Sequence, residues 1–162
     1  MSHIRVERLV LSAILMVAGT GCLWSAVIPG LFNTGVNDSG ALLPPGSVDP
    51  HWRLVQSADA GFPGPNALVV REGYPIAEGV WLANGPDSKW LAPRASQTSG
   101  NAAGDYVFRL TFDLGGFDPA TAVVRLRVCA DDWVPEVRLN GLPTGANVHG
   151  GFVAFSEDVS IT

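Results

Sequence analysis

The chain has 162 residues, a formal net charge of -5 and 15% charged residues. This length suits a single domain that is large enough to bury a hydrophobic core. An acidic surface repels phosphate backbones, which argues against nucleic acid as a partner. The 19 Gly and 12 Pro residues favour many turns and short strands over long helices.

The N-terminus has the pattern of a bacterial export signal. Arg5 and Arg8 precede an apolar run from Leu9 to Ala18. This run is too short to cross a bilayer as a helix, but it has the usual length of the hydrophobic part of a signal peptide. We therefore predict a signal peptide over residues 1–21 and a domain that is secreted or held at the bacterial cell surface. An uncleaved membrane anchor is the alternative.

Small residues after the apolar run leave two forms of processing open. Gly19-Thr20-Gly21 suits cleavage by signal peptidase I, which would release the domain. The same residues followed by Cys22 resemble a lipobox, in which case Cys22 is lipidated and anchors the chain to a membrane. The signal and this anchor are the membrane contacts that we expect. Cys129 is then left without an internal disulfide partner, and we expect it to be a buried free thiol.

Beyond residue 50, apolar and polar residues alternate with the period of a β-strand. In Tyr106–Leu114 the apolar residues share one face, while Arg109 and Asp113 lie on the other. Ala122–Ala130 repeats the pattern, with Val124, Leu126 and Val128 directed inward. Further strands are predicted over His51–Gln56, Ala67–Arg71, Ser88–Leu91, Val134–Asn140, Phe152–Phe155 and Val159–Ile161.

These elements predict an all-β fold. Short strands separated by turn residues are typical of an antiparallel β-sandwich, which we place over residues 51–162. A Gly- and Pro-rich lead-in loop precedes it over residues 22–50, and a loop rich in Ser, Gly and Asn is expected over residues 97–104. Asn140-Gly141 predicts a tight turn. Because the chain stops after a strand-like segment, we expect the sandwich to lack its last strand or strands.

Several segments resemble a module of secreted bacterial proteins, many of which carry PEP-CTERM-type sorting tails. The resemblance begins with Leu31–Val36 and Asp49–Val55 and continues through Trp81–Gly85, Ser88–Leu91 and Thr111–Leu114. It covers nearly all of the predicted mature chain. It implies a location outside the cytoplasm and a β-fold, and it does not specify an activity.

The C-terminal part is similar to galactose-binding-like jelly rolls, which include sugar-binding domains of several glycoside hydrolases. The similarity depends on Ala130–Asp132, Val137–Gly141 and Gly150–Phe155. It implies a jelly-roll fold and a carbohydrate or other extracellular ligand. The closing Asn-x-Leu segment of those domains is not found here, which leaves open whether the binding cleft is complete.

Trp133 is the candidate sugar-binding residue, because the flat C–H faces of sugars stack on exposed aromatic rings. It follows Asp131 and Asp132 in a turn, and Asn140 ends the next strand. These four residues are the predicted ligand site, and packing of Trp133 is the alternative. Three other Trp residues lie in strand-like runs and are expected in the core: Trp52, Trp81 and Trp90.

The acidic residues suggest a calcium site as a second possibility. Ca²⁺ binds six or more oxygen ligands, which Asp131, Asp132 and Asp158 could provide together with loop carbonyls. The alternative is that these side chains accept hydrogen bonds from the local backbone in turns. The same alternatives apply to Asp38 and Asp49 in the lead-in.

The sequence lacks the common catalytic motifs. After the predicted signal only His51 and His149 remain, and no Gly-x-Ser-x-Gly, His-Glu-x-x-His or phosphate-binding loop occurs. We therefore predict a non-catalytic extracellular module that binds carbohydrate. The alternatives are a structural or adhesive module that contacts other proteins, and a glycan-active enzyme fragment with paired carboxylates.

Overall fold

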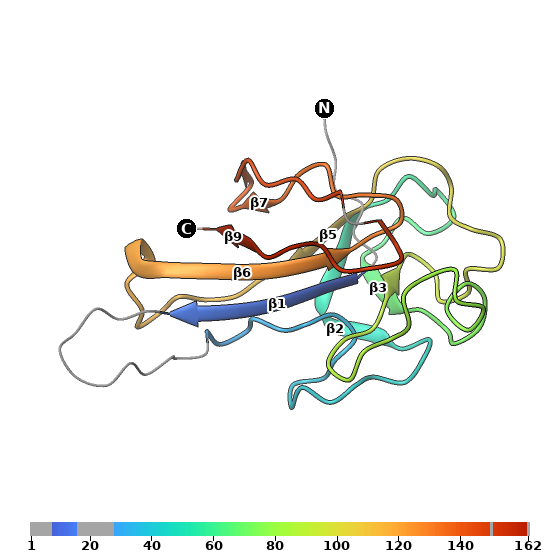
Figure 1. Ribbon diagram of the computed structural model, residues 1–162, viewed down its shortest axis with the longest axis horizontal. Helices are drawn as coiled ribbons and strands as arrows, with labels where there is room; N and C mark the ends of the chain where they lie inside the picture. The colour runs from blue at the N-terminus through green and yellow to red at the C-terminus, as the bar shows by residue number, and fades with distance from the viewer. Residues whose placement is uncertain (1–7, 16–27, 150, 162) are drawn as a thin grey trace.

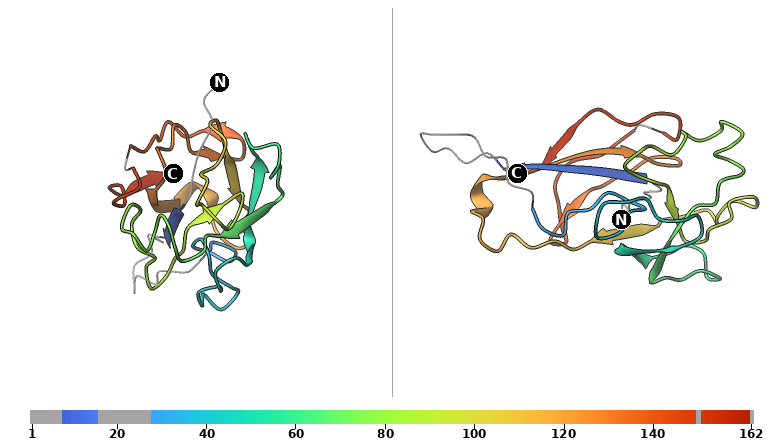
Figure 2. Two further views of the ribbon diagram at one scale, coloured as in Figure 1. Left: turned by 90° about the vertical axis from the view of Figure 1, so that its right-hand side faces the viewer. Right: turned by 90° about the horizontal axis from the view of Figure 1, so that it is seen from below.

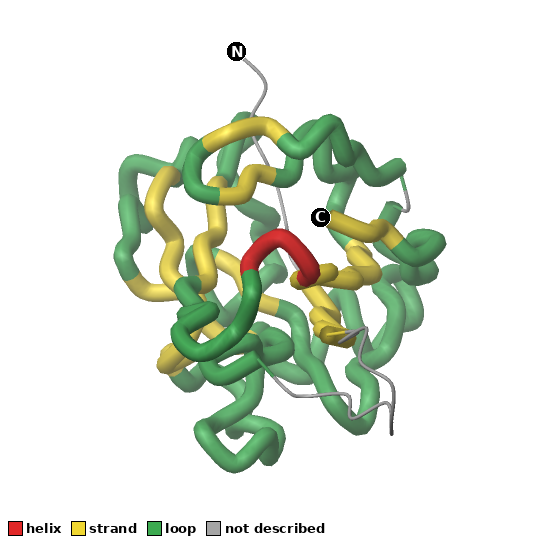
Figure 3. Tube along the Cα trace, turned by 90° about the vertical axis from the view of Figure 1, so that its left-hand side faces the viewer, coloured by secondary structure: helices red, strands yellow, loops and turns green. Residues whose placement is uncertain are grey.

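The computed structural model describes residues 8–15, 28–149 and 151–161. The regular structure in these ranges consists of β-strands and one short 3₁₀-helix, η1 (Pro119–Thr121). Figure 3 shows this helix as the single red segment, and loops make up much of the trace. The prediction of an all-β fold is confirmed. No helix in the described part of the chain is both long enough and apolar enough to cross a membrane.

The strands of the described ranges form three antiparallel sheets (Figure 1). The first sheet has the order β1 (Arg8–Leu15), β6 (Ala122–Cys129), β9 (Val159–Ile161). The second has the order β4 (Leu91–Ala92), β3 (Asn66–Val69), β2 (Val48–Gln56), β5 (Val107–Leu110). The third is a small hairpin of β7 (Arg138–Leu139) and β8 (Leu142–Pro143).

β1 lies beside β6 along its whole length (Figures 1 and 2). The pairing runs from Arg8 opposite Cys129 to Leu15 opposite Ala122. The backbone of this segment is therefore extended and paired in the structure, although the sequence places it in the apolar part of an export signal. The signal over residues 1–21 stays a prediction. Cys22, the predicted lipidation residue, lies outside the described residues.

One hydrophobic cluster joins the two larger sheets. It contains Trp52 and Leu54 of β2 and Phe108 of β5, together with Leu126 and Val128 of β6. The alternation predicted for β6 is confirmed, because Val124, Leu126 and Val128 are buried while Arg127 is exposed. The side chains of a strand point alternately to opposite faces, so a single buried face fixes the register of the whole strand.

Several strand predictions differ from the structure. Of the predicted strand Tyr106–Leu114 only Val107–Leu110 is a strand, and Ser88–Leu91 contributes only Leu91, the first residue of β4. Phe152–Phe155 forms a turn and a loop, because its two Phe rings pack against a second cluster around Trp90 without pairing their backbone in a sheet. Val134–Asn140 contributes only β7 and an isolated bridge between Val134 and Val148. The lead-in loop is also shorter than predicted, since β2 begins at Val48.

The tight turn predicted at Asn140-Gly141 is confirmed. It joins β7 to β8, and Asn140 and Gly141 have φ angles of 52° and 81°. Two consecutive positive φ angles are typical of the hairpin turn that Asn-Gly favours.

Candidate functional site

The loops that carry the site lie over the second hydrophobic cluster. Trp81 and Trp90 are its largest members, with ring centroids 4.6 Å apart. The indole N–H of Trp90 donates to the carbonyl of Leu82 at 2.7 Å. The core positions predicted for Trp52, Trp81 and Trp90 are confirmed, since each is at most 6% exposed. Cys129 is buried in the same cluster, also as predicted.

A recess of about 270 Å³ opens where three loops meet. Tyr74 and Trp81 come from the loop between β3 and β4, Gln97 and Asn101 from the loop between β4 and β5, and Asp131 directly follows β6. Tyr74 is 45% exposed, whereas Trp81 is buried. The recess therefore combines one accessible aromatic ring with polar side chains.

The polar wall of the recess is held by side-chain hydrogen bonds. The amide group of the buried Gln97 donates to the carbonyl of Arg94 at 2.6 Å. The amide group of Asn101 donates to Oε1 of Gln97 at 2.7 Å. The other amide atom of Asn101, Oδ1, is buried and has no hydrogen-bond partner among the described atoms. An unpaired buried acceptor costs roughly 1–3 kcal/mol.

Trp133, two residues after Asp131, forms a pair of exposed aromatic rings with His149. Val134 and Val148 form an isolated bridge, with mutual N–H to carbonyl bonds of 2.9 and 2.7 Å, and both are buried. Trp133 and His149 are the next pair in the same register and point to the opposite, exposed face. Their rings stack, with centroids 4.8 Å apart and planes inclined by 13°. The bridge thus sets the spacing of the two rings.

The structure brings one of the four predicted ligand residues into the recess. Asp131 lines it, and Trp133, two residues later, is 45% exposed. Asp132 is exposed, and the peptide bond that joins it to Asp131 is cis. Asn140 is not among the described residues that line the recess, because it forms the tip of the β7–β8 hairpin.

The predicted calcium cluster is not formed. Among the residues that the structure describes, no group of three or more His, Cys, Asp or Glu side chains is arranged to hold a metal ion. Asp158 instead lies 3.9 Å from Nε of Arg127, with which it forms an ion pair. Asp131, Asp132 and Asp158 therefore do not converge on one position.

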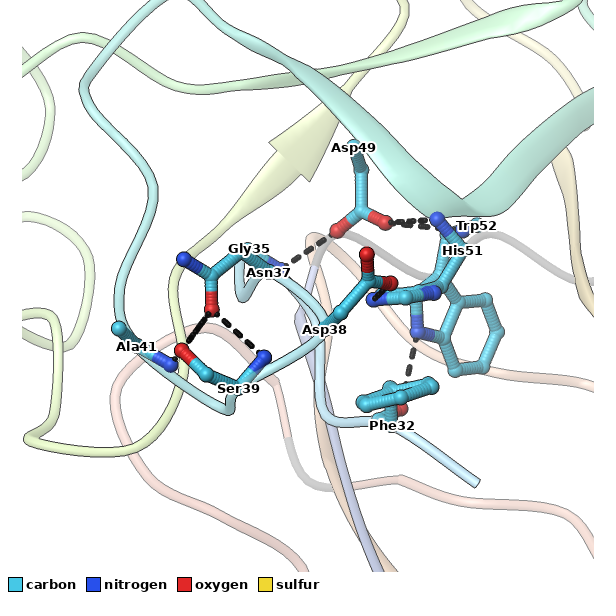
Figure 4. Close-up of polar contacts among 9 residues, drawn as sticks. All are labelled: Phe32, Gly35, Asn37, Asp38, Ser39, Ala41, Asp49, His51 and Trp52. Atoms are coloured by element: carbon cyan, nitrogen blue, oxygen red, sulfur yellow. Dashed lines mark hydrogen bonds and ion pairs between the residues drawn. The ribbon is translucent and has the colours of Figure 1, made fainter. Parts of the chain in front are cut away.

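The two acidic residues of the lead-in have different partners (Figure 4). The carboxylate of Asp49, which is 1% exposed, accepts hydrogen bonds from the N–H groups of Gly35, His51 and Trp52 at 2.7, 2.8 and 2.9 Å. Asp38 is exposed and lies 3.6 Å from Nε2 of His51. The ring of His51 stacks on Phe32 at 3.6 Å. For Asp49, the alternative of backbone capping is the correct one.

Sequence reasoning did not identify three residues of the recess: Tyr74, Gln97 and Asn101. The loop over residues 97–104 was expected from its composition, but Ser, Gly and Asn are common in any loop. Tyr74 carried the clearer signal, because an aromatic residue between Gly73 and Pro75 cannot easily belong to a strand and is often placed at the surface.

The chain matches no protein-family model, no curated protein and no solved structure.

Proposed function

We propose that this chain is a secreted, non-catalytic domain that binds carbohydrate in the recess between Tyr74 and Asp131. The supporting observation is that one recess combines an exposed aromatic ring with amide and carboxylate groups. The C–H face of a sugar would stack on Tyr74, and its hydroxyl groups would bond to the carboxylate of Asp131 and to polar groups of the loop from Gln97 to Asn101. Its volume of about 270 Å³ suits a single sugar ring or the end of a glycan chain.

The Trp133–His149 pair extends this site. Two residues of extended chain span at most about 7 Å, so Trp133 lies within reach of a sugar that follows the one in the recess. The exposed face of Trp133 would stack on that second sugar. The proposed ligand is therefore an oligosaccharide or a polysaccharide end, with one ring on Tyr74 and the next on Trp133.

We also propose that the two larger sheets are the layers of a galactose-binding-like jelly roll and that the domain acts outside the cell. The hydrophobic cluster shared by both sheets supports a layered arrangement. The signal-like N-terminus and the resemblance to modules of PEP-CTERM-type proteins support the location.

A glycan array followed by calorimetric titration of the best glycan tests the binding site. Tyr74→Ala and Asp131→Asn are each expected to lower the affinity about tenfold or more, the equivalent of one lost stacking or hydrogen-bonding contact. Tyr74→Phe keeps the ring and should retain most of the affinity. Leu142→Ala is a matched control, because Leu142 is 71% exposed on the β7–β8 hairpin, outside the recess.

Two results would contradict the proposal. One is the absence of binding to any glycan on the array. The other is a titration in which Tyr74→Ala binds as tightly as the wild type. Either result would favour the structural or adhesive alternative, in which exposed residues contact other proteins.

A further inference from the structure

Two arginines face each other on the outer surface of the second sheet. Arg53 of β2 is directly opposite Arg109 of β5 in the antiparallel ladder. Their neighbours Trp52, Leu54 and Phe108 are buried, so both Arg side chains project away from the core. Residues that are directly opposite in such a ladder have Cβ atoms about 4.5–5.5 Å apart, which lets both guanidinium groups reach one ligand.

Neither guanidinium has a partner among the described residues. Other cations of the described residues form ion pairs, which join Lys89 to Glu72, Arg127 to Asp158 and Arg138 to Glu136. Like charges directly opposite each other destabilise a sheet. The chain has 15 acidic and 10 basic residues, so it has ample carboxylates to neutralise this position. Both guanidinium groups are exposed and are therefore available to a ligand that carries negative charge.

The pair lies in a shallow groove of about 460 Å³ whose other wall is the Pro63-Gly64-Pro65 loop. This loop is held against β2 by a hydrogen bond of 3.0 Å from the N–H of Leu54 to the carbonyl of Pro65. Gly64 has a φ angle of 97°, and a Cβ at this position would overlap the carbonyl oxygen of Leu54. The close approach of the loop therefore requires glycine and gives the groove a fixed wall.

We propose that Arg53 and Arg109 form a second binding site, which takes a carboxylate or sulfate group of an acidic polysaccharide. The planar fork of arginine binds such oxyanions through two parallel hydrogen bonds, and two opposed forks neutralise the charge of one group. No residue lines both this groove and the loop recess, so the site is independent of the proposed function. Nucleic acid would require a longer basic track than one arginine pair on an acidic protein.

The test uses the whole chain at low ionic strength, with three polymers: polygalacturonate, dextran sulfate and uncharged dextran. We expect binding to at least one acidic polymer and not to dextran, and the preference between the two identifies the oxyanion. Arg53→Gln and Arg109→Gln should each weaken binding about tenfold, the equivalent of one charge-assisted contact. Arg71→Gln is the matched control, since it removes the same charge from an exposed position outside the groove.

Thermal unfolding of the same variants separates binding from a structural role. Loss of one charge relieves the repulsion, so Arg53→Gln and Arg109→Gln should have a Tm equal to or above that of Arg71→Gln. A lower Tm in both groove variants would show that the arginines stabilise the fold and would overturn the proposal. It would also be overturned if the wild type bound neither acidic polymer better than dextran, or if Arg71→Gln lost as much affinity as the groove variants.

Discussion

Trp133 and His149 stack at 4.8 Å because the residues beside them, Val134 and Val148, are hydrogen-bonded to each other. Both valines are buried, which anchors the bridge to the core, and both rings are exposed on its other side. The aromatic surface is therefore ordered before any ligand arrives. A rigid ring loses little conformational entropy on binding, which favours affinity.

Trp133→Ala should reduce glycan affinity about tenfold, through the loss of one stacking contact. Its effect on the free energy of unfolding should stay below about 1.5 kcal/mol, because the ring is 45% exposed and stacks on His149. Calorimetric titration and urea denaturation measure the two effects. Trp133→Phe keeps an aromatic face and should retain most of the affinity. A large loss of stability with unchanged affinity would assign Trp133 to packing.

Gly35→Ala should destabilise the fold more than Gly40→Ala. Both glycines have a positive φ, 73° and 78°. A Cβ at Gly35 would lie 2.6 Å from Cβ of Lys89, whereas a Cβ at Gly40 would meet nothing within 4 Å. Gly40→Ala should cost about 1 kcal/mol through backbone strain alone, and Gly35→Ala roughly 1–3 kcal/mol more through overpacking. Equal unfolding free energies in urea would show that the close approach to Lys89 is not maintained in solution.

Asp49→Ala should lower the free energy of unfolding by roughly 2–4 kcal/mol. The change leaves three backbone N–H groups without their acceptor, in a position where the side chain is 1% exposed. Asn37→Ala is the control, since Asn37 also accepts backbone N–H bonds, from Ser39 and Ala41, but in an exposed turn. Water can replace those bonds, so its cost should remain under about 1 kcal/mol. Denaturant titration of both variants provides the comparison.

Calcium should not change the thermal stability of the domain. A ligand that binds only the folded state raises the Tm, and the rise grows with the logarithm of ligand concentration above the Kd. The described residues, however, form no metal cluster, and Asp158 pairs with Arg127. Differential scanning calorimetry with millimolar CaCl₂ and with EDTA should give the same Tm. A rise with CaCl₂ that Asp158→Asn abolishes would restore the calcium site predicted from the sequence.

Strand prediction succeeded where one face of a strand is buried. In β6, Val124, Leu126 and Val128 alternate with Arg125 and Arg127, and this period is visible in the sequence. It was wrong for Phe152–Phe155. The aromatic residues of this segment pack against the second hydrophobic cluster from a loop, and their apolar character does not indicate a strand. The apolar run from Leu9 is ambiguous for a similar reason. A continuous apolar segment fits an export signal as well as a buried strand, and periodicity does not separate the two.

The candidate site could be predicted only in part. Asp131 and Trp133 were identified because they are neighbours in the sequence, and both lie at or near the recess. Tyr74 and Asn101 come from two other loops, and their position depends on how those loops pack over Trp81 and Trp90. Tertiary contacts of this kind leave no local pattern. The same holds for Arg53 and Arg109, which become neighbours only through the register of β2 and β5.

The position of β6 also has a consequence for the time at which the domain can fold. This strand pairs on one edge with β1, from the start of the chain, and on the other with β9, which ends at Ile161. Pairing strands that are distant in the sequence costs loop-closure entropy. The contacts that offset this cost form only when both partner strands are present. The first sheet can therefore assemble only after synthesis has reached β9. We expect folding to be slower than that of a helical protein of equal length, because these contacts join segments that are distant in the sequence.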